Sequence, residues 1–579
     1  MIPKMELTPE ICGRASRQGR NDLPSQQREI LAVSLVQTGI VFLVSYLLLF
    51  YGMSRRPGTY DEGIALTGAM RVAAGQIPHR DFYFIYGPAE VYMLAGLFKV
   101  FGPSLLVERL FDLLIKALLV ASIYAIVSSY CRRSIAIFAS VVTIVWLFGA
   151  GAFALAITPV SLLNLIGSAL LLPIFVSKVS TRRMLAAGAV SGAASLFRYD
   201  TGIALLIIHA CVISIAVCLR SEGTANKLRT FASTFWPYLL GFALLVTLPA
   251  LYYFHVARVG PLFHDIILYP SEYYHRGRNL PFPRLYLRGL ENLGIYLPIA
   301  IAGMSLYALV AGHWRTGGNS PPAEELHEEQ RWHGFLVTFG LLVVVMYLKG
   351  MVRVALIQMY LAVIPSILLV AVLYQHQSAF SRPLRIFNSC LLWLTLVAPS
   401  WLALHEIRLQ QMDHSSLAES IWPFNQDRSR DTQTAWCESR NPLTQGLCFL
   451  PEDDRIHTIE FIRAHTQAGQ SLYVGLKHHD RVVANDNIIY FATQRLPATH
   501  WSHFDPDLQN RYDIQTQMIR ELEQNTPPYI VLDAEFDSVR EPNDSAKSSG
   551  VTLLDGYLHD KYRLIETFGV LSIWQRRSP

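Results

Sequence analysis

Two adjacent carboxylates, Asp61 and Glu62, are the residues of this sequence best placed for acid–base chemistry. They follow the uncharged run Ile30–Phe50 after a short polar segment. A carboxylate in such a position can act as a general base that takes a proton from an acceptor hydroxyl. The alternative is structural, because an acidic residue in front of the helical stretch Ile64–Ala74 also caps free backbone N–H groups.

Several basic residues could bind an anion such as a phosphate, whose developing charge they would stabilise. These candidate cations are Arg80, Arg109, Arg198, Lys349 and Arg353. Each has a structural alternative. Arg109 could join salt bridges with Glu108 and Asp112, and Arg198 could pair with Asp200. The last two cations flank a turn between apolar runs, where basic side chains also snorkel to lipid headgroups.

A second polar segment, residues 269–278, is rich in aromatic and basic side chains. Aromatic rings stack on sugar faces, and arginines hold phosphates, although tyrosines also form ordinary interfacial belts. We predict that this segment faces a substrate. Its candidate contact residues are Tyr273, Tyr274, His275 and Arg276.

The sequence predicts no metal site and no other cofactor. Asp265 and Glu272 lack a recognisable ligand spacing, and the His500–His503 spacing within a loop is a weak zinc signal. A divalent ion stays open as an alternative.

Cys437 and Cys448 are the only cysteines beyond residue 404, so they could form a disulfide in an oxidising compartment. Two free thiols are the other interpretation.

The composition indicates a membrane protein. Of 579 residues 52% are hydrophobic and 16% charged, whereas soluble domains are about 25% charged. A net charge of +5 gives no argument for nucleic acid, and seven cysteines exclude a disulfide scaffold. The apolar residues lie in runs long enough for helices that cross a bilayer. We predict an α-helical polytopic protein with about 11 transmembrane helices.

Lys and Arg between the runs fit the positive-inside rule with this number of spans. The rule places residues 1–29 in the cytoplasm as a tail, followed by a transmembrane domain at 30–404. Loops 51–103 and 255–291 would lie outside. Residues 405–579 would form an extracytoplasmic soluble α/β domain. The stretch Ile85–Phe101 would be an interfacial helix, because counting it as a span would invert every later loop.

Several motifs occur in a fixed order. The acidic pair precedes Gly-x-x-Pro-x-x-Asp at 75–81, then Gly87-Pro88 and Leu97–Gly102. Arg198-Tyr199-Asp200 and residues 358–365 follow. With the predicted topology, this order resembles the GT-C glycosyltransferases over about residues 30–404. The nearest branch holds the protein O-mannosyltransferases and the lipid A aminoarabinose transferases.

The resemblance implies inverting transfer of a hexose or pentose from a polyprenyl-phosphate sugar to a lipid, glycan or protein acceptor. Asp61 would be the base, with Glu62 assisting. A lipid phosphate is already a competent leaving group, so no second carboxyl acid is required, unlike in glycosidases. The expected place is a bacterial cytoplasmic (inner) membrane, crossed many times, with the C-terminal domain periplasmic or extracellular. Membrane lipid would be a further partner.

Other functions remain open from the residues alone. An O-antigen ligase or polymerase, or an oligosaccharide transferase, would use similar donors. A flippase or transporter of lipid-linked sugars would place polar, broken helices at the bilayer midplane. A non-catalytic scaffold that displays residues 405–579 would tolerate changes at Asp61.

Overall fold

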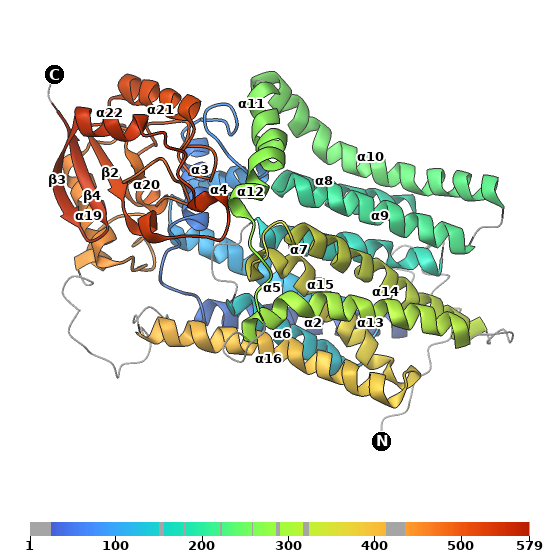
Figure 1. Ribbon diagram of the computed structural model, residues 1–579. Coiled ribbons are helices and arrows are strands. Elements are labelled where there is room, and N and C mark those ends of the chain that lie inside the picture. The colour runs from blue at the N-terminus through green and yellow to red at the C-terminus, as the bar shows by residue number, and fades with distance from the viewer. Residues whose placement is uncertain are drawn as a thin grey trace.

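The computed structural model describes residues 25–149, 156–177, 180–220, 223–257, 259–284, 290–315, 323–412 and 435–577. Long helices run side by side in one large bundle, and a smaller domain with a sheet lies at one end of it (Figure 1). Two short helices, α3 and α4, lie between the bundle and this domain. The tail 1–24 is outside the described residues.

Among the described residues, eleven helices lie where the eleven spans are predicted. They are α2 (Ser25–Tyr51), α5 (Leu105–Ser128), α6 (Arg133–Gly149), α7 (Ile157–Leu171), α8 (Thr181–Phe197), α9 (Tyr199–Arg220), α10 (Thr224–Val256), α13 (Leu293–Arg315), α14 (Ala323–Gly350), α15 (Leu356–Gln375) and α16 (Arg382–Met412). Among the described residues, nine are long and apolar enough to cross a membrane. The other two, α6 and α8, have 17 residues each and are shorter. The predicted fold class is confirmed.

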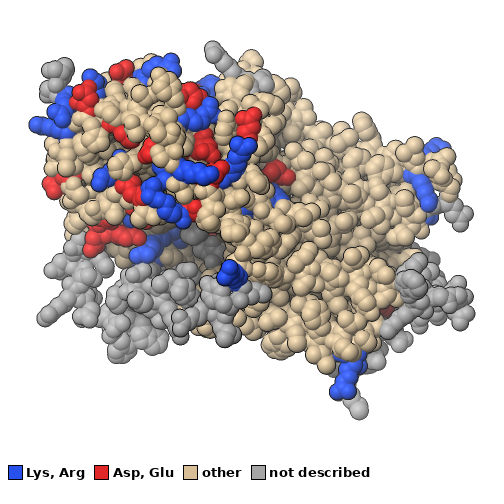
Figure 2. All heavy atoms as spheres, viewed as in Figure 1, with Lys and Arg blue, Asp and Glu red and all other residues tan. Residues whose placement is uncertain are grey.

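Charged side chains are distributed unevenly over the molecule. In Figure 2 they cover the C-terminal domain, whereas the side of the bundle is almost free of them. Basic side chains mark the other end of the bundle. Arg133 opens α6, Arg220 ends α9 and Arg382 opens α16. A bilayer hides apolar surface and excludes charge, so this pattern fits a membrane around the bundle.

The segment between the first two spans is folded rather than open. It holds α3 (Asp61–Ala73) and α4 (Ala89–Phe101), which pack on each other. The sequence predicts an interfacial helix at 85–101, and α4 lies at the end of the bundle beside the C-terminal domain (Figure 1). The later segment is helical too. It contains α11 (Val259–Phe263), two π-helical turns, η2 (His264–Leu268) and η3 (Pro270–Tyr274), and α12 (His275–Arg278).

The C-terminal domain is built on a four-stranded sheet of order β1-β2-β4-β3. β1 pairs with β2 in parallel, and the other two pairings are antiparallel. Its strands are β1 (Tyr473–Leu476), β2 (Tyr529–Asp533), β3 (Tyr562–Phe568) and β4 (Leu571–Arg576). Its helices are α19 (Asp453–His465), α20 (Ile488–Thr493), α21 (Tyr512–Asn525) and α22 (Leu553–Lys561). Short 3-10 turns occur in both parts of the protein. Those of the bundle are η1 (Leu172–Phe175), η4 (Leu290–Asn292) and η5 (Gln377–Ala379), and those of the C-terminal domain are η6 (Glu535–Ser538) and η7 (Asp544–Ala546).

A disulfide joins Cys437 to Cys448, the pair for which the sequence predicts a possible disulfide, and their two Cα atoms are 5.3 Å apart. The segment between α2 and α5 is bonded next to it, because the Nε of Arg55 donates to the carbonyl of Cys448 at 2.9 Å. The disulfide-closed turn is therefore part of the junction between the bundle and the C-terminal domain.

The C-terminal domain docks closely on α3. The hydroxyl of Thr67 donates to the carbonyl of Asn487 at 3.0 Å. Gly63 makes the approach possible, because a Cβ there would lie 2.7 Å from the amide nitrogen of Ile488. No side chain fits at that distance, so Gly63, directly after the acidic pair, lets the start of α20 contact the helix that carries it.

A methyl group at Gly63 should loosen this junction. We expect Gly63→Ala to destabilise the protein by about 1–3 kcal/mol through overpacking. Gly556→Ala is the matched control, because a Cβ there meets open space and glycine is a poor helix former. The measurement is the midpoint of thermal unfolding in detergent, with limited proteolysis between the bundle and the domain. Equal midpoints for both variants would contradict the close contact.

Candidate active site

Two adjoining cavities lie where the bundle meets the segment 61–90. The smaller, of about 30 Å³, is bordered by Asp61 and Glu90. The larger, of about 200 Å³, is bordered by Lys349 and Arg353. Both share the lining residues Tyr86, Arg198 and Gln358. We call the first the carboxyl chamber and the second the cation chamber. Together they form a cleft that brings Asp61 and three of the five predicted cations to one place.

Asp61 is the first residue of α3, and its side chain is exposed to the cleft. It makes no hydrogen bond to any residue that the structure describes. Desolvation by the surrounding protein raises the pKa of Asp61, while nearby Arg278, Arg353 and Arg198 act in the opposite direction. A carboxylate without a fixed partner, close to cations and with a raised pKa, can accept a proton from a bound hydroxyl.

Glu62 has a different environment. Its carboxylate is 1% exposed and pairs with the guanidinium of Arg109, with Nε 2.5 Å from Oε1 and Nη2 2.9 Å from Oε2. It also accepts the amide hydrogen of Gly58 at 2.6 Å. Arg109 further donates to the carbonyls of Ser54 and Arg56. Neither Glu62 nor Arg109 lines the cleft, so the structure places both in a buried pair that fixes the backbone before α3.

Gly87 brings the motif around Tyr86 against the end of α8. A Cβ at this glycine would lie 2.2 Å from the carbonyl oxygen of Leu196, and its amide donates to the carbonyl of Phe197. Tyr86 therefore reaches Arg198, whose guanidinium carbon lies 5.1 Å from the centre of the tyrosine ring. This cation–π contact holds Arg198 at the boundary between the two chambers.

Two cations of the larger chamber share one carboxylate. The Nζ of Lys349 lies 2.8 Å from an oxygen of Asp200, and Arg198 contacts the same oxygen at 3.4 Å. Arg198 and Lys349 carry two positive charges and Asp200 carries one negative charge, so the three groups together have a net charge of +1, a surplus of one positive charge. This surplus suits an anionic group that enters the chamber.

The remaining cation of the chamber is held by the C-terminal domain. Both terminal nitrogens of Arg353 bond to the carboxylate of Glu541, at 2.6 and 2.9 Å. Arg353 also donates to the backbone carbonyl of Arg278 at 3.0 Å. The sequence identified Arg353 but not Glu541, because nothing local relates residues 188 positions apart.

Arg278 and Asp505 form a second buried pair that the list of candidates from the sequence omits. Arg278 donates to Asp505 at 2.6 Å and to the hydroxyl of Tyr60 at 2.8 Å. The positive charge of Arg278 and its hydrogen bonds, with His503 nearby at 3.6 Å, bring the pKa of Asp505 down to about 2, against the effect of burial. Asp505 is therefore ionised at neutral pH. It binds Arg278, whose positive charge lies close to Asp61.

The other predicted contacts lie outside the chambers. Arg80 is on the surface in a two-point pair with Asp81. In the segment 273–276 only Tyr274 lines the cation chamber. Tyr273 lies under the guanidinium of Arg511, while His275 and Arg276 are exposed.

Within the part of the chain that the structure describes, three or more potential metal ligands never gather in one place. Asp265 pairs with His79 at 3.0 Å. His503 of the predicted His500–His503 spacing is buried, and so is His479. His479 bonds to Asp555 and to the hydroxyl of Tyr473.

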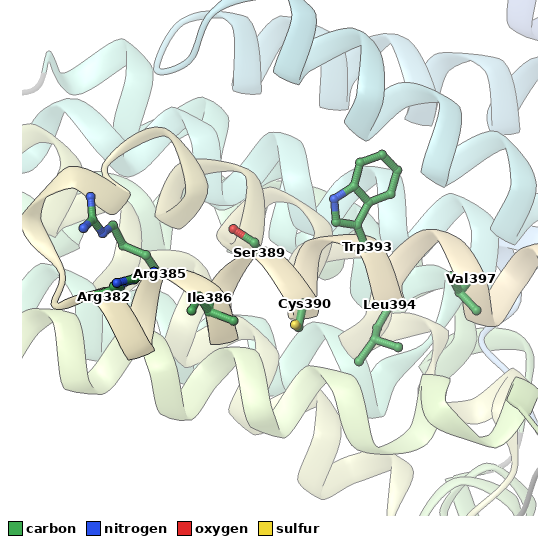
Figure 3. A pocket seen from close by; sticks show the side chains of 8 residues that line it. All are labelled: Arg382, Arg385, Ile386, Ser389, Cys390, Trp393, Leu394 and Val397. Atoms are coloured by element: carbon green, nitrogen blue, oxygen red, sulfur yellow. The ribbon is translucent and has the colours of Figure 1, made fainter.

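A third cavity, of about 660 Å³, runs along the outer face of α16 (Figure 3). Its lining side chains Ile386, Trp393 and Val397 are exposed, as expected for a surface that contacts lipid. Arg382 and Arg385 lie at one end, and no carboxylate borders it. It therefore lacks the groups that the cleft offers for acid–base chemistry.

Comparison with known proteins gives one family match. Residues 86–253 match the model of the family described as dolichyl-phosphate-mannose-protein mannosyltransferase. The segment runs from Tyr86 through Arg198 and Asp200, and it covers less than half of the chain. The predicted resemblance to GT-C glycosyltransferases is confirmed along it. The comparison with curated proteins gives no match.

The comparison with solved structures gives matches at low identity. The oligosaccharyltransferase of Archaeoglobus fulgidus in complex with Zn and sulfate is 10% identical, with 86% of this chain and 68% of that chain covered and a TM-score of 0.45. ArnT from Cupriavidus metallidurans bound to undecaprenyl phosphate is 12% identical, with 94% and 98% covered and a TM-score of 0.44. Such scores are too low to assign residues in this site.

The two ion pairs of Arg109 and Arg80 should differ in their effect on stability. Arg109→Met leaves Glu62 buried and unpaired, which costs about 3–5 kcal/mol. Arg80→Met breaks an exposed pair, so we expect a change within about 1 kcal/mol. Thermal unfolding in detergent measures both. Similar midpoints for the two variants would contradict the role of Arg109 as a buried anchor.

Proposed function

We propose that this protein is a membrane glycosyltransferase. It moves one sugar, a hexose or a pentose, from a polyprenyl-phosphate carrier to an acceptor hydroxyl on the extracytoplasmic face, with inversion. The observation that carries the proposal is the meeting of Asp61 with Arg198, Lys349 and Arg353 in one cleft at the end of the bundle. The proposed setting is a bacterial inner membrane, with a lipid, glycan or protein as acceptor.

Each part of the cleft fits one part of the reaction. The phosphate of the donor would lie among the cations of the larger chamber, which carry the surplus positive charge. The anomeric carbon is bonded to this phosphate, so the sugar would extend past Tyr86 toward Asp61. Aromatic side chains such as Tyr86 and Phe84 suit the faces of a sugar ring.

The transfer step balances without an added co-reactant. Asp61 takes the proton of the acceptor hydroxyl while the hydroxyl oxygen attacks the anomeric carbon from the side opposite to the phosphate. The bond between this carbon and the phosphate oxygen breaks, and polyprenyl phosphate leaves with the bonding electrons. Arg198, Lys349 and Arg353 stabilise the charge that develops on the leaving phosphate.

Alternatives within the enzymes rely on different residues. An O-antigen ligase or polymerase would use exterior Arg and His of a later loop. Of that loop, His275 and Arg276 are exposed and do not line the cleft with Asp61. The geometry therefore favours Asp61 as the reacting group.

Asp61→Asn should abolish transfer while leaving the fold intact. We expect turnover to fall about 10²–10⁴-fold, because a general base typically contributes that much. Purified protein would be given polyprenyl-phosphate sugars with a bacterial lipid and glycan extract as acceptor, and polyprenyl phosphate release followed by mass spectrometry. Asp560→Asn, at an exposed pair with Lys561, is the control. Release unaffected by Asp61→Asn would overturn the mechanism.

The rate should also depend on pH in a defined direction. Asp61 acts in its ionised form, and desolvation by the surrounding protein raises its pKa, so the rate should fall toward acid at a higher pH than the ordinary aspartate value of about 3.9. Rate profiles of kcat/KM against pH measure this fall. An acid limb that persists in the residual activity of Asp61→Asn would assign it to another group.

Lys349→Met should weaken donor binding. It removes one of the two cations that share Asp200, so we expect the KM for the donor to rise about tenfold, the equivalent of one charged hydrogen bond. Lys561→Met, which removes a surface lysine of the C-terminal domain, should leave KM unchanged. An unchanged KM in Lys349→Met would argue against the phosphate position.

A further inference from the structure

The carboxyl chamber contains a second acid, Glu90, to which the mechanism above gives no part. Glu90 is the second residue of α4 and is 7% exposed. Its oxygen Oε2 is fully buried and has no hydrogen-bond partner among the described residues. The side chain borders the same small cavity as Asp61 and Arg198. A buried polar atom without a partner is costly and calls for an explanation, and its place at the wall of a cavity favours a bound ligand as that explanation.

The surroundings of Glu90 keep it uncharged at neutral pH. Burial raises its pKa to about 8. The charged groups that face it are Asp61 on α3, Asp112 on α5 and Arg198 after α8. Burial is the largest effect; Arg198 lowers the pKa, and the two carboxylates raise it further. A neutral carboxyl group has one O–H donor and one carbonyl acceptor. A sugar hydroxyl also both donates and accepts, so the two groups can hydrogen-bond in either direction.

We propose that Glu90 is a specificity-determining residue that hydrogen-bonds a hydroxyl group of the transferred sugar. The inference rests on the proposed function. With the phosphate among the cations, the attached sugar extends into the chamber that Glu90 and Asp61 border, beside the rings of Phe84 and Tyr86. Phosphate itself is a poor ligand for Glu90, because two of the three cations that would neutralise it, Lys349 and Arg353, line only the other chamber.

The size of the chamber adds a condition. About 30 Å³ has room for one or two water molecules but not for a sugar. The chamber must widen when the donor enters, and the unpartnered Glu90 then gains a partner. A sugar that lacks the matching hydroxyl leaves the carboxyl group buried and unpaired, which is the strongest basis for rejecting an analogue.

Two variants test the proposal. Glu90→Gln keeps the shape, the neutral charge and a hydrogen-bond donor, whereas Glu90→Leu keeps only the approximate size. With the cognate donor, we expect Glu90→Gln to stay within about threefold of the wild type. Glu90→Leu should raise the donor KM about tenfold or more, as loss of a hydrogen bond worth 1.4 kcal/mol would. It should also lose discrimination between the cognate donor and a deoxy or epimeric analogue.

The pH profile separates recognition from mere packing. The neutral form of Glu90 predominates below its pKa, so wild-type kcat/KM should fall as pH rises through about 8. Glu90→Gln cannot ionise, and this alkaline limb should disappear. Persistence of the limb in Glu90→Gln, or unchanged donor discrimination in Glu90→Leu, would overturn the proposal.

Failure of the proposed function would look different. Wild-type release that survives Asp61→Asn would contradict the transferase mechanism. Normal dependence on Asp61 with no effect of Glu90 variants on selectivity or pH would contradict only the role of Glu90.

Discussion

The buried pair of Glu62 and Arg109 fixes the geometry on which the site depends. Both side chains are at most 2% exposed, so neither can be removed without leaving an unpaired charge away from water. The pair ties the first turn of α3 to α5. Consecutive residues of a helix point about 100° apart, since one turn takes 3.6 residues. Once Glu62 is directed at Arg109, its neighbour Asp61 is directed elsewhere, and in this protein it borders the cleft.

Carboxylates around the cleft fall into two groups. Those in the first group each bond to a cation and serve to hold it. They are Glu62, Asp200, Asp505 and Glu541. The second group consists of Asp61 and Glu90, which border the small chamber without a bonded cation. The same side-chain chemistry therefore serves two purposes, and the presence of a fixed partner separates them. Acids with a partner are structural, and those without one remain available to a ligand.

The C-terminal domain is part of this arrangement rather than an addition to it. Asp505 and Glu541 come from that domain, and each holds an arginine of the segments that surround the cleft. The domain also docks on α3 through the close approach at Gly63. A display function would need none of these contacts. The domain and the bundle instead share ion pairs at the end of the helices, where the proposed donor and acceptor would meet.

The sequence by itself determined the features that depend on local patterns. The eleven predicted spans became eleven helices, and residues beyond 404, predicted as an α/β domain, contain a four-stranded sheet with helices. Cys437 and Cys448 are predicted as a possible pair because they are the only cysteines beyond residue 404, and the structure joins them. Tertiary structure alone decided which charged groups are free. Arg278 and Asp505 are 227 positions apart, and no periodicity relates them. Whether a carboxylate acts or supports depends on burial and on the nearest cation, and both arise only when distant segments pack together.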